Sequence, residues 1–434
     1  MDGSPIQAWY ALVHVCRRWR SIVFASPCRL HLQLRCTERT PVRELLDVWP
    51  ALPINIESIF NTASLIEGAD NIVAALEHND RVCYVDLEDV PSPLMERFAA
   101  AMQQPFPELT HLTLSLWSDD ETMPVLPETF FGGSAPRLRY CEVDYLPFPA
   151  LQKLVLSAGH HLVHLSLLWT PHSGYDSPEA VVNCLSAMTN LEQLSIGFRS
   201  HPEQRLSPLT RTRTIFHALT HFTFVGASEY LEDFVSRIDA PQLFFFIIQL
   251  FHQHVFDVSQ LNQFIGRTDK LRAFDTADVT FRNDSASVTL PREAWPFDLP
   301  KLRLAISCDS FDWQLLSMTQ ICGSLPSLPT LEHLHICEEL WQPYWHDDMD
   351  NTQWLDFLYP FTAVKNLYLS KRFALYVMAA LQELAKERVM DVLPALQNLY
   401  LEGLQPSGPV QAAIGQFVVA RQLSDHPVTV EHWL

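Results

Sequence analysis

Leu109-Thr110-His111-Leu112-Thr113-Leu114 is the stretch on which the rest of this sequence is patterned. Its Leu-x-x-Leu-x-Leu spacing returns in four further stretches: Leu162–Leu167, Leu191–Ile196, Leu331–Ile336 and Leu396–Leu401. Looser copies begin at Val82, Leu138, Leu219, Leu243, Leu271, Leu302 and Val364, and successive copies start 24 to 33 residues apart. A period in this range predicts a solenoid, in which each short unit buries its apolar side against its neighbours.

Helix signals lie between the copies. Ser177-Pro178-Glu179 is one of them, because serine suits a helix N-cap and proline suits the first turn. The repeated phrase resembles that of leucine-rich repeats, so the expected fold is α/β: an irregular solenoid with a parallel β-sheet on the concave face and helices on the convex face. We assign residues 36–434 to this solenoid and residues 1–35 to a short helical segment. Prolines before several strands, as in Phe106-Pro107-Glu108-Leu109, predict turns that end the preceding helix.

The composition limits the kinds of partner. The chain of 434 residues has 50 acidic against 30 basic side chains and a formal charge of −20, which argues against a nucleic-acid partner. Its nine cysteines are scattered and form no Cys-x-x-Cys pair, so we expect a reducing compartment, cytoplasmic or nuclear. The longest apolar run, Leu243–Leu250, is too short to cross a bilayer, and no membrane association is expected.

The residues before the solenoid have a different pattern. We expect an amphipathic helix that ends at Ser26-Pro27 and has one apolar face, formed by Leu12, Val15, Cys16, Trp19, Ile22 and Val23. Val15-Cys16-Arg17-Arg18-Trp19-Arg20 resembles the second half of an F-box, and with the leucine-rich tail the chain is similar to the large F-box families of mushroom-forming fungi. The Leu-Pro segment and the first helix of an F-box have no counterpart in this sequence.

The resemblance implies a function. In that family the F-box binds the adaptor subunit of a cullin–RING ubiquitin ligase, and the tail binds the substrate protein. The chain would then be a substrate-recruiting subunit, with the six apolar residues of the first helix on the adaptor. The alternative is a stand-alone leucine-rich-repeat interaction scaffold without ligase coupling, because only half of the F-box is present. Neither reading identifies the substrate.

Two stretches are candidates for contact with a partner. Phe245 and Ile247 take outward positions of a strand that polar residues usually occupy, so they predict an exposed apolar strip unless a loop covers them or the strand register differs by one. Trp341, Tyr344 and Trp345 belong to a long acidic loop, and aromatic side chains dominate binding energy at interfaces.

Histidine recurs at the third position of the phrase, at His111, His164, His221 and His333. Tyr140 and Gln193 take the same position in intervening copies, so the histidines should lie roughly 10 Å apart, too far for one zinc ion. We therefore expect no metal site and no cofactor. The sequence also lacks a phosphate-binding glycine loop, a Gly-x-Ser-x-Gly motif and a His-Glu-x-x-His motif, so we assign no catalytic residue and no enzymatic activity.

Overall fold

The computed structural model describes most of the chain. The described residues are 13–25, 33–49, 51–58, 62–117, 124, 126–127, 129–171, 176–200, 213–253, 255–272, 274–290, 301–326, 328–339, 351–384, 388–403 and 409–433. They fall into two compact units, unit 1 with residues 1–176 and 183–199 and unit 2 with residues 177–182 and 200–434. The predicted boundary near residue 35 is not tested by this division.

Unit 1 is a parallel sheet whose strands follow one another in chain order. The strands are β1 (Leu34–Cys36), β2 (Ile54–Glu57), β3 (Val82–Val90), β4 (His111–Leu116), β5 (Tyr140–Asp144), β6 (His164–Thr170) and β7 (Gln193–Phe198). The helices are α2 (Arg17–Phe24), α3 (Val42–Val48), α4 (Thr62–Leu76), α5 (Ser92–Ala101), α6 (Phe148–Ala158) and the 3₁₀ turns η1 (Phe130–Gly133) and η2 (Gly159–His161). Helix α7 (Pro178–Leu185) contributes residues to both units.

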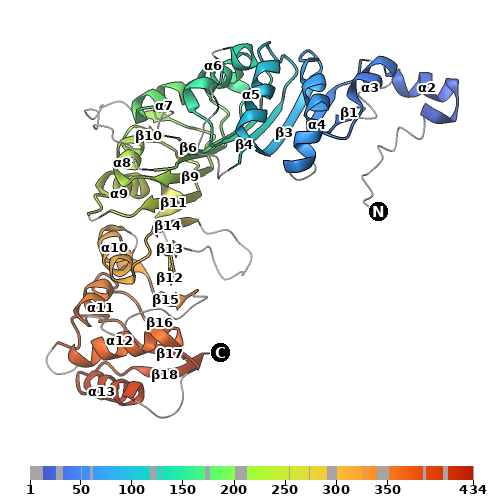
Figure 1. The fold of residues 1–434 in the computed structure, drawn as a ribbon. Helices are drawn as coiled ribbons and strands as arrows, with labels where there is room; N and C mark the ends of the chain where they lie inside the picture. Colours follow the sequence, from blue (N-terminus) through green and yellow to red (C-terminus); the bar gives the residue numbers. More distant parts are fainter. Residues whose placement is uncertain are drawn as a thin grey trace. The chain divides into compact units, whose positions relative to one another are not determined.

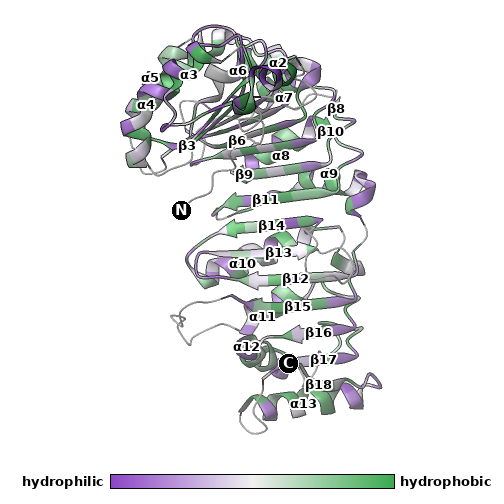
Figure 2. Cartoon of the chain, turned by 90° about the vertical axis from the view of Figure 1, so that its right-hand side faces the viewer, coloured by the Kyte–Doolittle hydropathy of each residue, from purple (hydrophilic) through white to green (hydrophobic). Residues whose placement is uncertain are grey.

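Unit 2 has a mostly parallel sheet whose strand order departs from chain order. Its order is β9 (His221–Gly226), β11 (Phe245–Phe251), β14 (Leu302–Ser307), β13 (Ser285–Leu290), β12 (Thr276–Phe281), β15 (His333–Glu338), β16 (Asn366–Leu369), β17 (Asn398–Glu402) and β18 (Thr429–Trp433), as Figure 2 shows. A separate parallel pair joins β8 (Thr214–Ile215) to β10 (Ile238–Asp239). The helices are α8 (Ser228–Ser236), α9 (Ser259–Arg267), α10 (Phe311–Ser324), α11 (Asn351–Leu358), α12 (Lys371–Leu384), α13 (Pro409–Leu423) and the 3₁₀ turns η4 (Asp269–Leu271) and η5 (Leu328–Thr330).

The repeated phrase forms the strands as expected. Leu109, Leu112 and Leu114 are fully buried, and His111 between them is exposed. The amide of Leu109 donates to the carbonyl of Phe106 at 3.3 Å, which confirms the turn predicted before this strand. Within each unit the helices lie along one side of the strands (Figure 1), so the buried leucines face them and the alternate side chains face away. The predicted α/β repeat fold is confirmed.

The sheet is largely parallel, as the repeats predict, and departs from this arrangement at one strand. The phrase that starts at Leu271 leads to β12, but β14 is the strand that pairs with β11, in parallel register from Phe246 to Phe251. Strand β13 lies between β14 and β12 and is antiparallel to both. Ala286, Val288 and Leu290 on β13 are buried. The apolar side chains of β13 therefore continue the buried face of the sheet even though the strand is antiparallel. The repeat period alone does not show in which direction a strand runs.

The predicted single helix at the N-terminus is also wrong in detail. Cys16 has an extended backbone with φ −163° and ψ 169°, and α2 begins only at Arg17. The guanidinium Nε of Arg20 donates to the carbonyl of Val13 at 3.2 Å, across this break. Buried and exposed apolar residues lie on both sides of the break: Val13 and Val23 are buried, whereas Val15, Trp19 and Ile22 are 64%, 47% and 56% exposed.

None of the helices in the described ranges combines the length and the apolar character needed to cross a bilayer.

Candidate functional site

The strongest candidate site lies on the sheet of unit 1, on the face turned away from the helices. Strand register places the third residue of each phrase beside that of the next copy, about 4.8 Å away. The resulting tyrosine–histidine row consists of Tyr84, His111, Tyr140, His164 and Gln193. The sequence pattern predicted Tyr140 and Gln193 in these intervening places, and the register confirms it.

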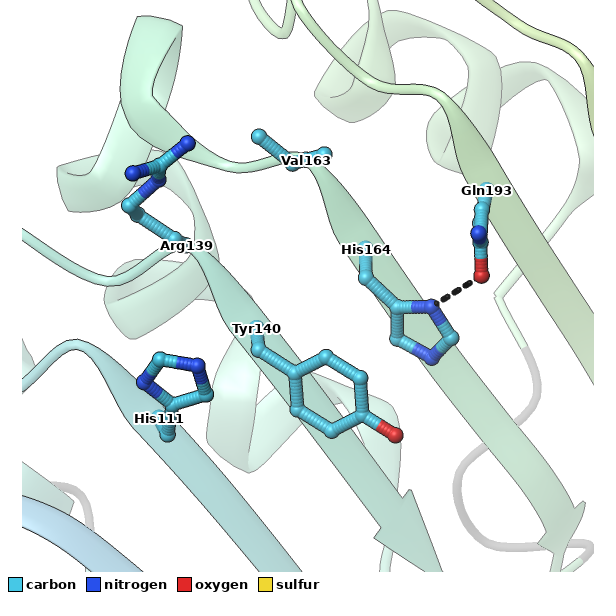
Figure 3. Close-up of a pocket in the computed structure, with 6 residues that line it drawn as sticks. All are labelled: His111, Arg139, Tyr140, Val163, His164 and Gln193. Atoms are coloured by element: carbon cyan, nitrogen blue, oxygen red, sulfur yellow. Dashed lines mark hydrogen bonds between the residues drawn. The ribbon is translucent and has the colours of Figure 1, made fainter.

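The three central rings of this row stack on one another. Tyr140 and His164 lie 4.1 Å apart between ring centroids with an angle of 11° between the rings, and His111 and Tyr140 lie 5.9 Å apart at 22°. In Figure 3 the ring of Tyr140 stands between the two imidazoles. His111 is exposed to solvent and also stacks on its aromatic neighbour, so the ring of Tyr140 orders both imidazoles.

Hydrogen bonds hold the row in place. His164 Nδ1 and the side-chain amide oxygen of Gln193 are 2.8 Å apart, within hydrogen-bond distance. His164 Nε2 is buried and has no partner among the described residues. Burial lowers the pKa of His111, and the charge of Arg139 lowers it further. Both effects favour the neutral imidazole. A neutral ring stacks on its neighbour without the cost of removing a charge from water.

A pocket of about 280 Å³ opens along this row. It is lined by His111, Arg139, Tyr140, Val163, His164 and Gln193. Figure 3 shows Arg139 near the amino ends of the strands and the hydroxyl of Tyr140 pointing away from it. The pocket is therefore cationic at one end and open toward the phenol hydroxyl at the other.

Beyond the tyrosine hydroxyls lies the carboxylate group of unit 1, defined by Asp86, Glu88, Glu142 and Asp144. The hydroxyl of Tyr84 donates to Asp86 at 3.2 Å, and that of Tyr140 donates to Glu142. Asp86 and Glu142 flank Thr113 in the strand register, so they are two strands apart. Sequence analysis missed this group, although the fifth position of each phrase, read from copy to copy, contains Asp86 and Glu142.

Burial, with the crowding of carboxylates second, raises the pKa of three of these carboxyls. Burial raises the pKa of Asp144 to about 6, with a further contribution from the charge of Glu142. Burial also raises the pKa of Asp86 and of Glu88, and neighbouring carboxylates add to both shifts. Among the described residues none of the four forms an ion pair with a basic side chain, whereas the nearby Glu57 pairs with Arg35.

Unit 2 contains a second stacked row on the corresponding face. His335 and Tyr368 stack at 4.1 Å, and Tyr368 and Tyr400 at 4.4 Å with an angle of 7°. Beside them Asn398 donates to Asn366 at 2.7 Å, and Asn366 lies 3.3 Å from His333. Burial, followed by the charge of His333, lowers the pKa of His335 to about 4. This row is predominantly neutral.

The predicted partner residues Phe245 and Ile247 alternate with the fully buried Phe246 and Ile248. They are half-buried and face away from the core, which confirms the register used to predict them. The ring of Phe245 stacks on His221 at 4.6 Å, so part of this apolar strip is covered by its neighbour. Its role in binding stays a prediction. Trp341, Tyr344 and Trp345 lie outside the described residues.

The predicted adaptor-binding residues are only partly brought together. Trp19 and Ile22 are one turn apart on the exposed side of α2, and Val15 and Cys16 are exposed at the break before it. Val23 is in the interior and cannot contact an adaptor in this conformation. Leu12 lies outside the described residues. The expected common face is therefore reduced to the four exposed residues.

The described residues hold no group of three or more histidine, cysteine or carboxylate side chains arranged to bind a metal ion.

Comparison with known proteins gives a likeness of fold only. No family model matches the chain, and no curated protein matches it. Several solved structures do match. One is the crystal structure of the leucine-rich repeat-containing protein LegL7 from Legionella pneumophila, which is 13% identical, with a match that covers 74% of this chain and 93% of that chain at a TM-score of 0.28. The repeat architecture of this chain rests on the strand registers above.

Proposed function

We propose that this chain is a protein-interaction scaffold that binds partner proteins on the sheet faces turned away from its helices, and that it has no catalytic activity. The observation that supports this most is the stacked row of unit 1, in which Tyr140 is held between His111 and His164. Side chains ordered before binding lose little conformational entropy when a partner arrives. An aromatic surface of this kind supplies the contacts that dominate binding energy in protein interfaces.

The test compares two faces of the same protein. Tyr140→Asp alters the sheet face, and Glu96→Lys alters the exposed surface of α5 on the helix side. Wild type and both variants are used to capture proteins from a cell extract, and the captured proteins are quantified by mass spectrometry. A partner retained by Glu96→Lys and lost by Tyr140→Asp supports the proposal. Identical captured sets for all three proteins would contradict it.

We further propose that the scaffold is coupled to a cullin–RING ubiquitin ligase as a substrate-recruiting subunit. The support is the resemblance of Val15–Arg20 to half of an F-box, together with the exposure of Val15, Trp19 and Ile22. Exposed large apolar side chains close together mark surfaces that contact other proteins. This function would place the protein in the cytoplasm or nucleus.

Ligase coupling is tested by a pull-down of the full chain with the adaptor subunit. Ile22→Ser removes an exposed side chain of α2, and Ile66→Ser is a matched control because Ile66 of α4 is 57% exposed against 56% for Ile22. Adaptor binding that is lost with Trp19→Ala and Ile22→Ser but kept with Ile66→Ser supports coupling. Absence of binding by the folded wild type would exclude it and leave the scaffold function.

A further inference from the structure

We infer that the sheet face of unit 2 binds an extended acidic segment of a partner protein, with carboxylates on basic side chains of β14 and an apolar side chain on β11. This binding rests on the proposed scaffold function and specifies the partner chemistry of one face. The β11–β14 surface, where it would take place, consists of Phe245 and Ile247 on β11, Arg303 on β14 and Lys301 immediately before β14.

The apolar and basic side chains of this surface lie on the same face of the sheet. Strands β11 and β14 are parallel neighbours (Figure 2), and Ile247 lies directly beside Arg303 in their register. Gln249 of β11 donates to Ser307 of β14 at 3.1 Å, so the outward positions of the two strands share one face. Alternation along β14 places Lys301 on that face too. The apolar and the basic side chains are therefore about one strand spacing, 4.8 Å, apart.

The basic side chains have no acidic neighbour on these strands. Strands β9, β11, β14 and β13 are consecutive in the sheet and contain no aspartate or glutamate, although the chain has 50 acidic side chains. Arg282 pairs with Glu339, whereas no carboxylate within the described ranges pairs with Arg303. The ammonium of Lys301 lies 5.9 Å from the ring centre of Phe274, again without a carboxylate partner in those ranges. The surface is therefore a local basic area on an acidic protein.

The guanidinium of Arg303 is held in an unfavourable environment in the free protein. The side chain is half-buried, and a charge that leaves water without a partner costs free energy. Burial lowers the pKa of this guanidinium, the charge of Arg282 lowers it further, and the charge of Glu339 opposes both effects. A carboxylate would neutralise the guanidinium and accept two parallel hydrogen bonds from it. The surface is therefore better satisfied with an anion bound than without one.

The apolar half of the surface requires that the anion be carried by a molecule with an apolar side chain. The ring of Phe245 stacks on His221 at 4.6 Å, which fixes its orientation before a partner arrives. Ile247 lies between Thr223 and Arg303 in the strand register and keeps part of its side chain in contact with water. An apolar side chain placed on Ile247 would remove both from water. A free inorganic anion would use only the basic half.

The spacing of the two halves favours an extended protein segment. Alternate side chains of such a segment lie on one side, about 6.8 Å apart. An apolar residue on Ile247 and a carboxylate two residues away would therefore contact Ile247 and Arg303 at the same time. Single-stranded RNA also offers anions and flat apolar groups, but a chain of formal charge −20 repels a long polyanion. A segment with two carboxylates needs only Lys301 and Arg303.

The experiment measures binding of a fluorescently labelled peptide to the full chain by anisotropy. The peptide has one leucine, with an aspartate two residues to either side, in a serine–glycine background. The salt concentration is about 0.15 M, at which charges more than roughly 8 Å apart are screened. A peptide with asparagine in place of aspartate and a single-stranded RNA of the same length complete the set. We expect the aspartate peptide to bind at least about tenfold more tightly than the asparagine peptide, the difference expected for one charge-assisted hydrogen bond, and more tightly than the RNA.

The variants separate the β11–β14 surface from the rest of unit 2. Ile247→Ser with Arg303→Gln alters the surface, and Lys371→Gln with Leu375→Ser makes a comparable change on the exposed side of α12, where Leu375 is 47% exposed. The first pair should weaken binding of the aspartate peptide at least about tenfold and the second less than about twofold. Arg303→Gln alone should lose most of the preference for aspartate over asparagine, because the guanidinium that distinguishes them is gone. Thermal unfolding of each variant confirms that it is folded.

Four outcomes would overturn the inference: no binding of the aspartate peptide to wild type, equal weakening by both pairs, an unchanged preference for aspartate in Arg303→Gln, or tighter binding of the RNA. Each leaves the scaffold function open to its own test in unit 1. If Tyr140→Asp loses a captured partner while the aspartate peptide does not bind, the chain is a scaffold whose β11–β14 surface does not bind acidic segments. If that variant loses no partner either, the proposed function fails as well.

Discussion

The ring of Tyr140 lies almost parallel to the imidazole of His164, with centroids 4.1 Å apart, although the two residues are 24 positions apart in the chain. Their strands β5 and β6 are neighbours in register, so each residue occupies the same place in its own repeat. The contact therefore belongs to the repeat architecture and joins consecutive units on the face away from the helices. Stacking of this kind stabilises the sheet and also orders the side chains on its surface.

Replacing the ring of Tyr140 should lower stability by a measurable amount. Tyr140→Leu keeps an apolar side chain but removes the stacks with His111 and His164, and we expect a loss of about 1 kcal/mol in the free energy of unfolding. Denaturant unfolding followed by circular dichroism measures it. Tyr359→Leu is the control because Tyr359 is 61% exposed. Equal effects of the two substitutions would show that the stacks add nothing.

The pKa of Asp144 predicts how stability depends on pH. Burial and the charge of Glu142 raise this pKa to about 6 in the folded protein, above the ordinary value of 3.8. The folded state therefore binds the proton more tightly, and the stabilisation that protonation provides is lost as pH rises through 6. Asp144→Asn should raise the melting temperature at pH 7.5 by about 2 °C, and less at pH 5. The control Glu96→Gln should show no such difference between the two pH values, and a gain for Asp144→Asn that is the same at both would contradict the assignment.

The aromatic core of unit 2, where β12 meets three helices, can be tested by mutation. Trp354 of α11 is fully buried and contacts Phe281 of β12, Phe311 of α10 and Phe373 of α12. Trp354→Ala should cost about 3–5 kcal/mol because it leaves a cavity where these elements meet. Trp354→Phe should cost less than half of that, since the indole N–H that it removes has no partner in the described part of the chain. Comparable losses for both would indicate an unseen bond to that N–H.

Much of the repeat fold could be predicted before any coordinates. The phrase Leu109–Leu114 predicted a strand with Leu112 and Leu114 inside and His111 outside, and this is observed. Periodicity succeeds here because side chains alternate across a strand, so the apolar set alone decides which face is buried. The same reasoning correctly placed Phe245 and Ile247 on the outward face of β11.

Other features depended on contacts between distant parts of the chain. The break at Cys16 could not be seen in the helical spacing of Val15, Trp19 and Ile22, because spacing does not report where a helix is interrupted. The insertion of β13 between β14 and β12 is a choice among strand partners with similar apolar patterns. In both cases several arrangements satisfy the local pattern, and packing over the whole unit selects one.

The sequence by itself determined the repeat, the faces of its strands and the acidic charge of the chain. Only the tertiary structure decided that His111, Tyr140 and His164 form one stacked row and that Asp86, Glu142 and Asp144 gather beside it. The physical reason is the separation in sequence of the residues that produce each property. Alternation and charge belong to single residues and their immediate neighbours, whereas stacking and raised pKa values arise between side chains that the sheet register brings together from copies about 28 residues apart.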